Sequence, residues 1–310
     1  MAETAQIRGP AITFAIPYYS NAEYLLEAIS SVRAQTIDDW ELLVVDDAGP
    51  EPAADLVAAL TDRRIRYIRN PTNLGLAGNW NACVALAAAP MVTLLHADDR
   101  LRPDYAATVL AAARQSPTAA AVFTDVAIIG ADGEPARSLP DLVKRFARRP
   151  SHNHDVVGDA GLAGILANNY VMCPTLCYRK DVVGDAPFDG RWKFVLDLDH
   201  ATRLLLAGHR LRGVRMVLYD YRRHSENQTS TLTADARRFA EEIELYRSIE
   251  RSAATVGFTR TAKAARHRSM VRVHLALRAA IDLAHRHVQP ARVKAVMLWA
   301  DLRHRPLDTA

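Results

Sequence analysis

Residues 41–47 of the 310-residue chain are ELLVVDD, an apolar run that ends in two aspartates, and residues 91–99, MVTLLHADD, repeat this arrangement. Short continuous apolar runs are typical of strands that are buried on both faces of a parallel sheet. In open parallel sheets, ligands bind beyond the carboxyl ends of the strands. The two acidic pairs, Asp46-Asp47 and Asp98-Asp99, therefore predict a binding site at one edge of an α/β sheet.

Segments typical of strands and of helices alternate along the first half of the chain. The expected strands are 11–16, 41–45, 64–68, 91–95 and 119–126, and the expected helices are 21–34, 52–60, 76–88 and 103–114. This alternation predicts a Rossmann-like, mostly parallel central sheet with helices on both faces.

The second half of the chain is less regular. Residues 130–160 contain three prolines and little periodicity, which predicts a long loop, and loops of this length are often lids or binding loops. The elements expected after it are helices at 161–168 and 197–207 and strands at 171–178 and 214–221. After Leu232 we expect two or three helices, for example at 234–252, 261–287 and 290–303.

Charge divides the chain into two parts. Residues 1–234 contain 24 Lys+Arg and 27 Asp+Glu, whereas residues 235–310 contain 15 and 8, so the net charges are −3 and +7. We therefore expect a mildly acidic domain at 1–232 and a basic helical C-terminal region at 233–310. The three cysteines exclude a disulfide framework, and the chain shows neither a signal-peptide pattern nor an apolar run of the ~18 residues that a membrane span needs. These features predict a cytoplasmic protein.

The basic C-terminal region is compatible with several roles. Residues 260–305 contain eleven Lys+Arg and two Asp+Glu, with apolar residues interleaved. This pattern fits helices that lie on an anionic membrane surface, which would place the protein peripherally at the inner face of the membrane. It fits equally helices packed on the rest of the chain or on a second subunit in a homodimer. No recognised nucleic-acid-binding module is present, so nucleic acid is not an expected partner.

The acidic pairs have a structural and a functional interpretation. An isolated Asp-Asp before Pro103 is more often a helix N-cap pair, but two such pairs on two strands of one sheet favour a site. Carboxylates suit Mg²⁺ or Mn²⁺, which bridge the phosphates of a substrate. The chain lacks the glycine-rich dinucleotide fingerprint, the P-loop and the G-x-S-x-G elbow, so side chains and a metal would have to hold any nucleotide.

A series of short motifs resembles family 2 glycosyltransferases. The first motifs are FAIPYYSN at 14–21, ISSVRAQT at 29–36 and WELLVVDD at 40–47. They are followed by NLG at 73–75, Asn81, HADD at 96–99, Pro103, Phe188, DLD at 197–199, Arg203, Gly208 and YRRH at 221–224. The resemblance covers about residues 11–230, and the order and spacing of the motifs make it specific.

The resemblance implies a GT-A fold with two halves. Residues 11–130 would bind the nucleotide sugar and residues 131–232 the acceptor, followed by the C-terminal helical extension. Positions that match donor-binding positions of the family are Pro17, Tyr19, Asp46, Asp47, Asn73, His96 and Asp98. Tyr19 would stack on the base and Asp47 would accept from a pyrimidine N–H, which favours a UDP- or dTDP-sugar. We also expect Asn73 and Gly75 to be turn residues that position the following helix, and Asn81 to be a structural hydrogen bonder.

The resemblance also implies a divalent cation, Mn²⁺ or Mg²⁺, and transfer with inversion. The expected metal site consists of Asp98, Asp99 and His224. His96 replaces the first acid of the family's D-x-D motif, so metal retention would depend more on Asp98 and on the diphosphate.

Asp197 matches the catalytic base of the family. Asp199 is the rival base, and because residues two apart point to different sides of a helix, only one of them can face the sugar. Trp192 is a candidate for stacking on an acceptor sugar, with core packing as its alternative.

Three functions follow as hypotheses. The first is a hexosyltransferase-type enzyme that transfers a sugar to a hydroxyl of a glycan, a lipid-linked molecule or a small molecule. The second is a non-catalytic protein that binds nucleotide sugars or acts as a scaffold, which His96 in the D-x-D motif would permit. The third is a sugar-1-phosphate nucleotidylyltransferase, which the segment IPYYSNAEYL at 16–25 disfavours because that class carries a glycine-rich loop there.

Overall fold

The computed structural model describes residues 9–136, 150–168, 170–223 and 236–303. At its centre lies a nine-stranded sheet in the order β3-β2-β1-β4-β8-β6-β9-β5, with β7 paired to β9. The strands are β1 (Ile12–Tyr18), β2 (Trp40–Asp46), β3 (Ile65–Arg69), β4 (Met91–Leu94), β5 (Arg100–Leu101), β6 (Ala119–Ile129), β7 (His154–Val157), β8 (Cys177–Arg179) and β9 (Arg210–Arg222). All strands except β5, β7 and β8 run in one direction, so the predicted mostly parallel α/β fold is confirmed.

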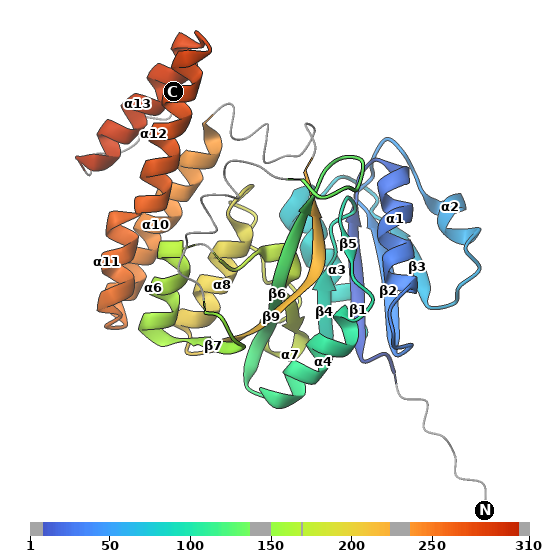
Figure 1. Ribbon diagram of the computed structural model, residues 1–310. Coiled ribbons are helices and arrows are strands. Elements are labelled where there is room, and N and C mark those ends of the chain that lie inside the picture. Colours follow the sequence, from blue (N-terminus) through green and yellow to red (C-terminus); the bar gives the residue numbers. More distant parts are fainter. Residues whose placement is uncertain (1–8, 137–149, 169, 224–235, 304–310) are drawn as a thin grey trace, which may run out of the picture.

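Helices cover both faces of the sheet, and the C-terminal helices lie beyond one end of it (Figure 1). The helices are α1 (Ala22–Arg33), α2 (Ala54–Ala58), α3 (Gly75–Leu86), α4 (Tyr105–Gln115), α6 (Gly158–Asn168), α7 (Lys180–Val183), α8 (Leu196–Leu206), α10 (Arg237–Thr255), α11 (Thr259–His267), α12 (Ser269–Ala284) and α13 (Val288–Leu302). A 3₁₀ turn, η1 (Cys173–Thr175), precedes β8.

The two faces of the sheet bury different sets of side chains, because successive residues of a strand point to opposite sides. Ile12, Phe14 and Ile16 of β1 pack in one core with residues of α1 and α4. Ala15 of β1 and Leu43 of β2 belong to the other core, which includes residues of α3, α6, α8 and α10. Burial on both faces explains why the strands are continuous apolar runs in the sequence.

Several expected elements of the second half are wrong in type or length. Residues 173–175 of the expected strand 171–178 form the 3₁₀ turn η1, where Pro174 has no N–H to donate to a neighbouring strand, and only residues 177 and 178 belong to a strand, β8. The expected loop 130–160 contains β7, and residues 137–149 of that loop lie outside the described residues. The two-residue strand β5 was not predicted either, since both strands are too short to show periodicity.

The C-terminal region of the described chain contains four helices instead of two or three. The expected helix 261–287 is interrupted at Arg268, whose backbone is left-handed with φ of 35°. The side chain of Arg268 is 1% exposed and its Nε donates to both oxygens of Asp301, at 2.8 and 2.9 Å. Phe239 of α10 and Leu275 of α12 belong to the same core as α8, so the expectation that this region packs on the rest of the chain is confirmed for α10–α12.

Candidate active site

The carboxyl ends of β1, β2 and β4 lie side by side. Tyr18 pairs with Asp46, and the backbone N–H of Asp47 donates to the carbonyl of Tyr18 at 2.9 Å. Gly49 follows this pair, and a Cβ atom there would lie 1.7 Å from the carbonyl oxygen of Tyr19, so only glycine permits this approach. The end of β1 and the loop after β2 are thereby fixed against each other at the edge of the sheet.

Asp46 is a structural carboxylate. It is fully buried and accepts hydrogen bonds from the Tyr67 hydroxyl, the Arg69 guanidinium and the Gly49 N–H. Burial also raises the pKa of Tyr18 to about 12, and the Tyr18 hydroxyl donates to the carbonyl of Glu51. Asp46 therefore supports this edge of the sheet from inside, as the neighbour of Asp47, and has no exposed surface for a nucleotide.

Asp47 holds the start of α3. Its carboxylate accepts from the Asn70 amide at 3.0 Å and from the backbone N–H groups of Leu74 and Gly75 at 2.8 and 3.0 Å. Asn73 accepts from the Gly75 N–H at 2.9 Å, and Gly75 has φ of +72°, so the expectation that these two are turn residues is confirmed. Whether Asp47 also meets a base stays a prediction.

Pro17 and Tyr19 border this edge from β1. Pro17 is partly buried, whereas Tyr19 is 51% exposed, the most exposed of the aromatic side chains in the described residues at this edge. An exposed aromatic ring beside the carboxyl ends of the strands is available for stacking on a planar base. This placement is compatible with the role that we predict for Tyr19.

The segment after β4 brings His96, Asp98 and Asp99 together. One potential ligand atom from each of the three residues lies within 4.8 Å of the other two. Asp99 is fully buried, and its oxygens accept from the Tyr219 hydroxyl at 2.8 Å and from the Arg222 N–H at 2.7 Å. Burial, and then the charge of Asp98, raises the pKa of Asp99 well above its usual range.

His96 is uncharged at neutral pH. Burial lowers its pKa, and the ring lies against Trp80 with 5.4 Å between the ring centroids. Its Nδ1 lies 3.6 Å from an oxygen of Asp99. A neutral imidazole in this place can donate to or accept from a hydroxyl, but it adds no charge to the site.

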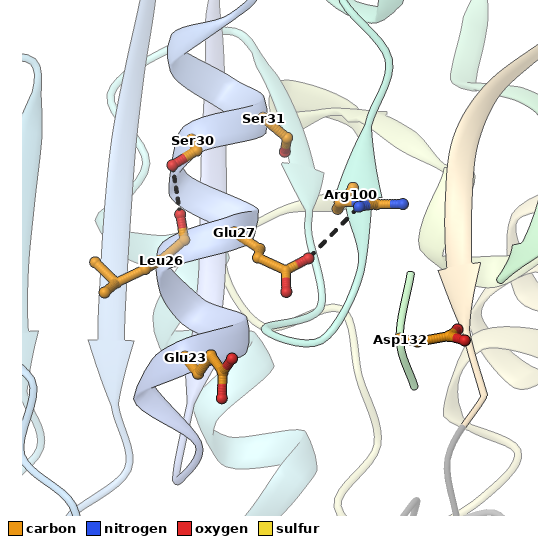
Figure 2. A pocket seen from close by; sticks show the side chains of 7 residues that line it. All are labelled: Glu23, Leu26, Glu27, Ser30, Ser31, Arg100 and Asp132. Atoms are coloured by element: carbon orange, nitrogen blue, oxygen red, sulfur yellow. Dashed lines mark hydrogen bonds and ion pairs between the residues drawn. The ribbon is translucent and has the colours of Figure 1, made fainter. Parts of the chain in front are cut away.

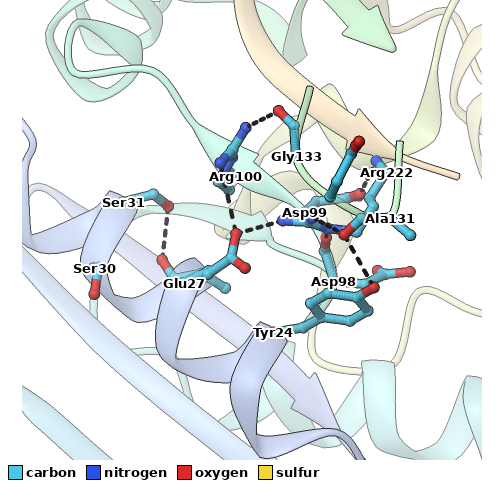
Figure 3. Close-up of polar contacts among 12 residues, drawn as sticks. Tyr24, Glu27, Ser30, Ser31, Asp98, Asp99, Arg100, Ala131, Gly133 and Arg222 are labelled. Carbon is cyan, nitrogen blue, oxygen red and sulfur yellow. Dashed lines mark hydrogen bonds and ion pairs between the residues drawn. The ribbon is translucent and has the colours of Figure 1, made fainter. Parts of the chain in front are cut away.

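Arg222 connects the segment after β4 to three other elements. Its side chain is 1% exposed; Nε donates to the carbonyl of Asp98 at 2.7 Å and Nη1 to that of Ala131 at 2.8 Å. The guanidinium also pairs with Glu27 of α1 and lies 4.4 Å above the ring of Tyr24 (Figure 3). Arg222 is the last residue of β9, so this strand end holds both the backbone of Asp98 and the carboxylate of Asp99.

The residues after β4 fit a divalent cation. Oxygen ligands suit Mg²⁺ and Mn²⁺, and these metals usually keep one or two protein carboxylates together with substrate phosphates. Asp98 is partly exposed, whereas the oxygens of Asp99 already accept two hydrogen bonds inside the protein. Of these two carboxylates, Asp98 is therefore favoured as the one that would hold the metal, and Asp99 supports the segment from inside the protein. His224 lies outside the described residues.

Asp197 lies in the first turn of α8, in the second half of the domain. It is partly buried, and burial raises the pKa of its carboxyl. Backbone N–H groups, the thiol of Cys173 and the charge of Arg238 act in the opposite direction and favour its ionised form. A carboxylate with a raised pKa is suited to accepting a proton.

The two neighbouring candidates are differently placed. Asp199 is 4% exposed and its oxygen accepts from Nε of Arg203 at 2.8 Å, so it is already paired. This pairing favours Asp197 over Asp199 as the group that meets an acceptor. Trp192 is 3% exposed and belongs to the core that includes residues of α3, α6, α8 and α10. This agrees with the alternative that Trp192 packs in the core, and it leaves no exposed ring face for a sugar.

An aromatic cluster joins the segment after β4 to α8. Trp80 of α3 packs edge-on against Phe188 at 5.1 Å between centroids, and Phe188 lies 5.3 Å from His200 of α8. The side chain of Asn81 donates to the carbonyl of Phe188 and accepts from its N–H, both at 2.9 Å. The expectation that Asn81 is a structural hydrogen bonder is confirmed, and the cluster connects α3 to α8 through Phe188.

Helix α10 contributes side chains to the surroundings of Asp197, which the sequence did not suggest. The carboxylate of Glu241 accepts from the N–H groups of Lys193 and Phe194, just before α8, at 2.8–3.1 Å. Arg238 lies 4.3 Å above the ring of Phe194 and pairs with Glu242 at 3.1 Å. These residues lie more than forty positions after Asp197, and no local pattern connects them to it.

An open hollow of about 580 Å³ lies beside α1 (Figure 2). Its walls are formed by residues of α1, β5 and the turn after β6, namely Glu23, Leu26, Glu27, Ser30, Ser31, Arg100 and Asp132. None of the predicted donor, metal or base residues lines it. Its lining is connected to the site through Glu27, which pairs with Arg222, and we do not assign the chemistry to it.

Comparisons with known proteins agree with this arrangement. The sequence model of glycosyl transferase family 2 matches residues 13–165. The succinoglycan biosynthesis protein ExoO of Rhizobium meliloti is 32% identical over 141 residues, which cover 46% of this chain and 40% of ExoO. WcaA of Escherichia coli, provisionally named a colanic acid biosynthesis glycosyl transferase, is 30% identical to this chain over 155 residues. The matched residues cover 48% of this chain and 55% of WcaA. The chain thus spans about half the length of the curated relatives it matches.

The solved structures include a similar fold at low sequence identity. Residues 1–349 of S. aureus TarS superpose with a TM-score of 0.66 at 15% identity, covering 94% of this chain and 79% of that one. The complex of the same TarS fragment with UDP-GlcNAc gives a TM-score of 0.61 at 17% identity, covering 77% and 66%.

The sheet order, the helices on both faces and the acidic segment at the carboxyl edge are those of the GT-A fold. Residues 13–165, about half of the chain, match the sequence model of glycosyl transferase family 2, in agreement with the resemblance of the motifs from FAIPYYSN onward. None of the helices in the described parts of the chain is long and apolar enough to cross a bilayer.

Proposed function

We propose that this protein is a metal-dependent inverting glycosyltransferase that transfers a sugar from a nucleoside diphosphate to an acceptor hydroxyl. The observation that carries the proposal is a pair of carboxylates with different surroundings. Asp98 lies at the edge where β1, β2 and β4 end, and Asp197, whose pKa is raised by burial, lies at the start of α8. The names of the relatives, which refer to colanic acid and succinoglycan biosynthesis, support a glycan acceptor.

Asp197 acts in this proposal as the general base. It takes the proton of the acceptor hydroxyl as the oxygen forms a bond to the anomeric carbon, and the bond from that carbon to the diphosphate oxygen breaks. Attack from the side opposite the leaving group inverts the anomeric centre. Asp98 would hold the cation, which when bound supplies positive charge beside the leaving diphosphate.

The donor is proposed to be a UDP- or dTDP-sugar. Tyr19 is half exposed at the end of β1 and offers a stacking face, and Asp47 fixes the loop beside it. That S. aureus TarS has been crystallised with UDP-GlcNAc and with UDP supports a pyrimidine nucleotide.

Calorimetric titration with UDP, dTDP and GDP, each with Mn²⁺ or with EDTA, tests the donor site. We expect one pyrimidine diphosphate to bind in the presence of metal, and Asp98→Ala to weaken that binding on the order of a hundredfold, because it removes the metal carboxylate. Asp55→Ala changes an exposed carboxylate of α2 and serves as the control. If folded protein binds none of the three nucleotides with metal present, the proposal is wrong and a scaffold role takes its place.

The pH dependence of transfer tests the base. Asp197 accepts a proton only in its ionised form, and its pKa is raised, so kcat should fall as the pH is lowered through that pKa. The Cys173 thiol favours the ionised form of Asp197, so Cys173→Ala should raise the pKa of Asp197 further. The acidic limb of the plot of kcat against pH should then move to higher pH by up to about one unit. Cys83→Ala removes another buried thiol and should leave the limb in place. An unchanged limb in Cys173→Ala would count against Asp197 as the titrating group.

A further inference from the structure

Helices α12 and α13 present large apolar side chains to solvent. Val273 and Leu277 of α12 lie on one side of the helix, four residues apart, and the exposed Ala280 and Ala284 continue that side. We call the exposed apolar surface of the two helices the α12–α13 face. Its members are 46–64% exposed: Val273, Leu277, Leu283, Val288, Val293, Val296, Trp299 and Leu302.

The charges on the same two helices are sorted by sign. Residues 269–303 contain two carboxylates, Asp282 and Asp301, and both are buried. Asp282 pairs with Lys294 at 2.8 Å, and Asp301 pairs with Arg268 and Arg272, both at 2.8 Å. Every exposed side-chain charge on these helices and on the turn between them is therefore positive.

Three exposed arginines accompany the apolar side chains. Arg286 lies in the turn between the helices, Arg292 lies on α13, and Arg303 follows the end of α13 with its guanidinium 4.3 Å above the ring of Trp299. An apolar face with cations around it and no exposed carboxylate matches an anionic bilayer surface, which takes up apolar side chains below the headgroups and attracts arginine at their level. Trp299 beside Arg303 combines both properties at one position.

A second copy of the chain is a poorer occupant of this face. If two α12–α13 faces met, the apolar surfaces would pack, but the exposed arginines of both copies would face one another without a carboxylate from these helices to pair with. Like charges brought together without partners are unfavourable. The charge pattern therefore favours lipid over self-association.

We propose that the α12–α13 face docks this protein on an anionic lipid surface, as a peripheral contact that does not span the bilayer. Val273, Leu277, Val296 and Trp299 enter the interface, and Arg286, Arg292 and Arg303 lie among the headgroups. The contact belongs to the C-terminal helices, so it is separate from Asp98 and Asp197. It does not depend on the proposed transfer reaction and can be measured without a substrate.

Vesicle flotation of the full chain tests the proposal. Vesicles of phosphatidylcholine and phosphatidylglycerol in roughly equal amounts should carry the protein to the top of a sucrose gradient, whereas vesicles of phosphatidylcholine alone should carry much less. High salt should weaken the binding to anionic vesicles, because it screens the arginines. This comparison uses the unmodified protein and is independent of any variant.

Matched variants locate the contact. Leu277→Ser combined with Trp299→Ser should lower the partition coefficient at least about tenfold, and Arg286→Glu combined with Arg292→Glu should abolish the preference for anionic vesicles. Met216→Ser combined with Leu56→Ser changes exposed apolar side chains of β9 and α2, 48% and 41% exposed, and should have no effect. Thermal unfolding of each variant should remain close to that of the parent, since the changed side chains are largely exposed.

Three results would overturn the proposal. The first is equal or absent flotation with both kinds of vesicle. The second is a loss of flotation that is the same in the β9/α2 control as in the variants of the α12–α13 face. The third is light scattering that shows a dimer of the parent which dissociates in Leu277→Ser with Trp299→Ser, because the face would then belong to a second copy.

Discussion

The variant Asp197→Asn is expected to lose about 10²–10⁴-fold in kcat, while its affinity for the nucleotide donor stays within a factor of about two. Asparagine keeps the shape of the side chain and can still accept hydrogen bonds from the Leu198 N–H and the Cys173 thiol. It cannot take a proton from the acceptor hydroxyl. Transfer would then depend on water or on the unaided hydroxyl, and the rate falls although the site is intact.

Two measurements on the same preparation separate this effect from a general loss of structure. Asp185→Asn changes a carboxylate that is 73% exposed and pairs with Lys180 at 3.5 Å, and it should keep full activity. Calorimetry with the diphosphate and Mn²⁺ should give the same affinity for parent and Asp197→Asn. If turnover survives in Asp197→Asn, the base is another group, and if neither protein turns over while both bind the diphosphate, the chain binds donors without transferring them.

The parallel half of the fold could be predicted from the sequence because its strands are buried on both faces. Residues 41–45 and 91–95 are continuous apolar runs followed by acids, and each is a strand in the structure at nearly the predicted bounds. Strands β5 and β7 have two and four residues, which is too short for a periodic pattern. Their pairing with β9 depends on the whole sheet and not on local preference.

The gathering of acidic residues at the carboxyl edge of the sheet could also be predicted, but which of these carboxylates are buried and hydrogen-bonded could not. Asp46, Asp98 and Asp99 are similar in sequence, each adjoining another aspartate after a strand. In the structure, Asp46 and Asp99 are fully buried and hydrogen-bonded, whereas Asp98 is partly exposed. Tertiary partners such as Tyr67, which binds Asp46, decide this, and the sequence near each acid does not reveal them.

The contribution of the C-terminal region was hidden for the same reason. Its net positive charge suggested a surface role, yet Glu241 of α10 caps the backbone of Lys193 and Phe194 ahead of Asp197. Arg238 of the same helix favours the ionised form of Asp197. The boundary near residue 232 therefore separates two patterns of charge, but the helix after it completes the surroundings of the predicted base.

Replacing Arg222 by methionine is expected to lower the free energy of unfolding by about 3–5 kcal/mol and to weaken metal-dependent nucleotide binding. Methionine preserves much of the buried stem but donates no hydrogen bonds. The carbonyls of Asp98 and Ala131 would lose their donors, and Glu27 would lose its buried partner. Since Glu27 is itself 37% exposed, water can solvate it, and most of the loss is expected from the part-buried hydrogen bonds of the guanidinium to the two carbonyls, which hold the backbone that carries Asp98.

Urea unfolding of Arg222→Met beside Arg100→Met measures this effect against a matched control. Arg100 also pairs with Glu27, at 3.6 Å, and donates to the carbonyl of Gly133, but its side chain is 32% exposed, so its loss should cost only about 1 kcal/mol. Adding Glu27→Leu to Arg222→Met should recover only a small part of the lost stability if the carbonyls dominate. The expectation is wrong if both arginine variants lose the same free energy of unfolding, or if Glu27→Leu restores all of it in the double variant. Arg222 would then stabilise the protein through its ion pair with Glu27 and not by holding the backbone of Asp98. In that case nucleotide binding should survive in Arg222→Met, because the segment after β4 would hold its shape without this arginine.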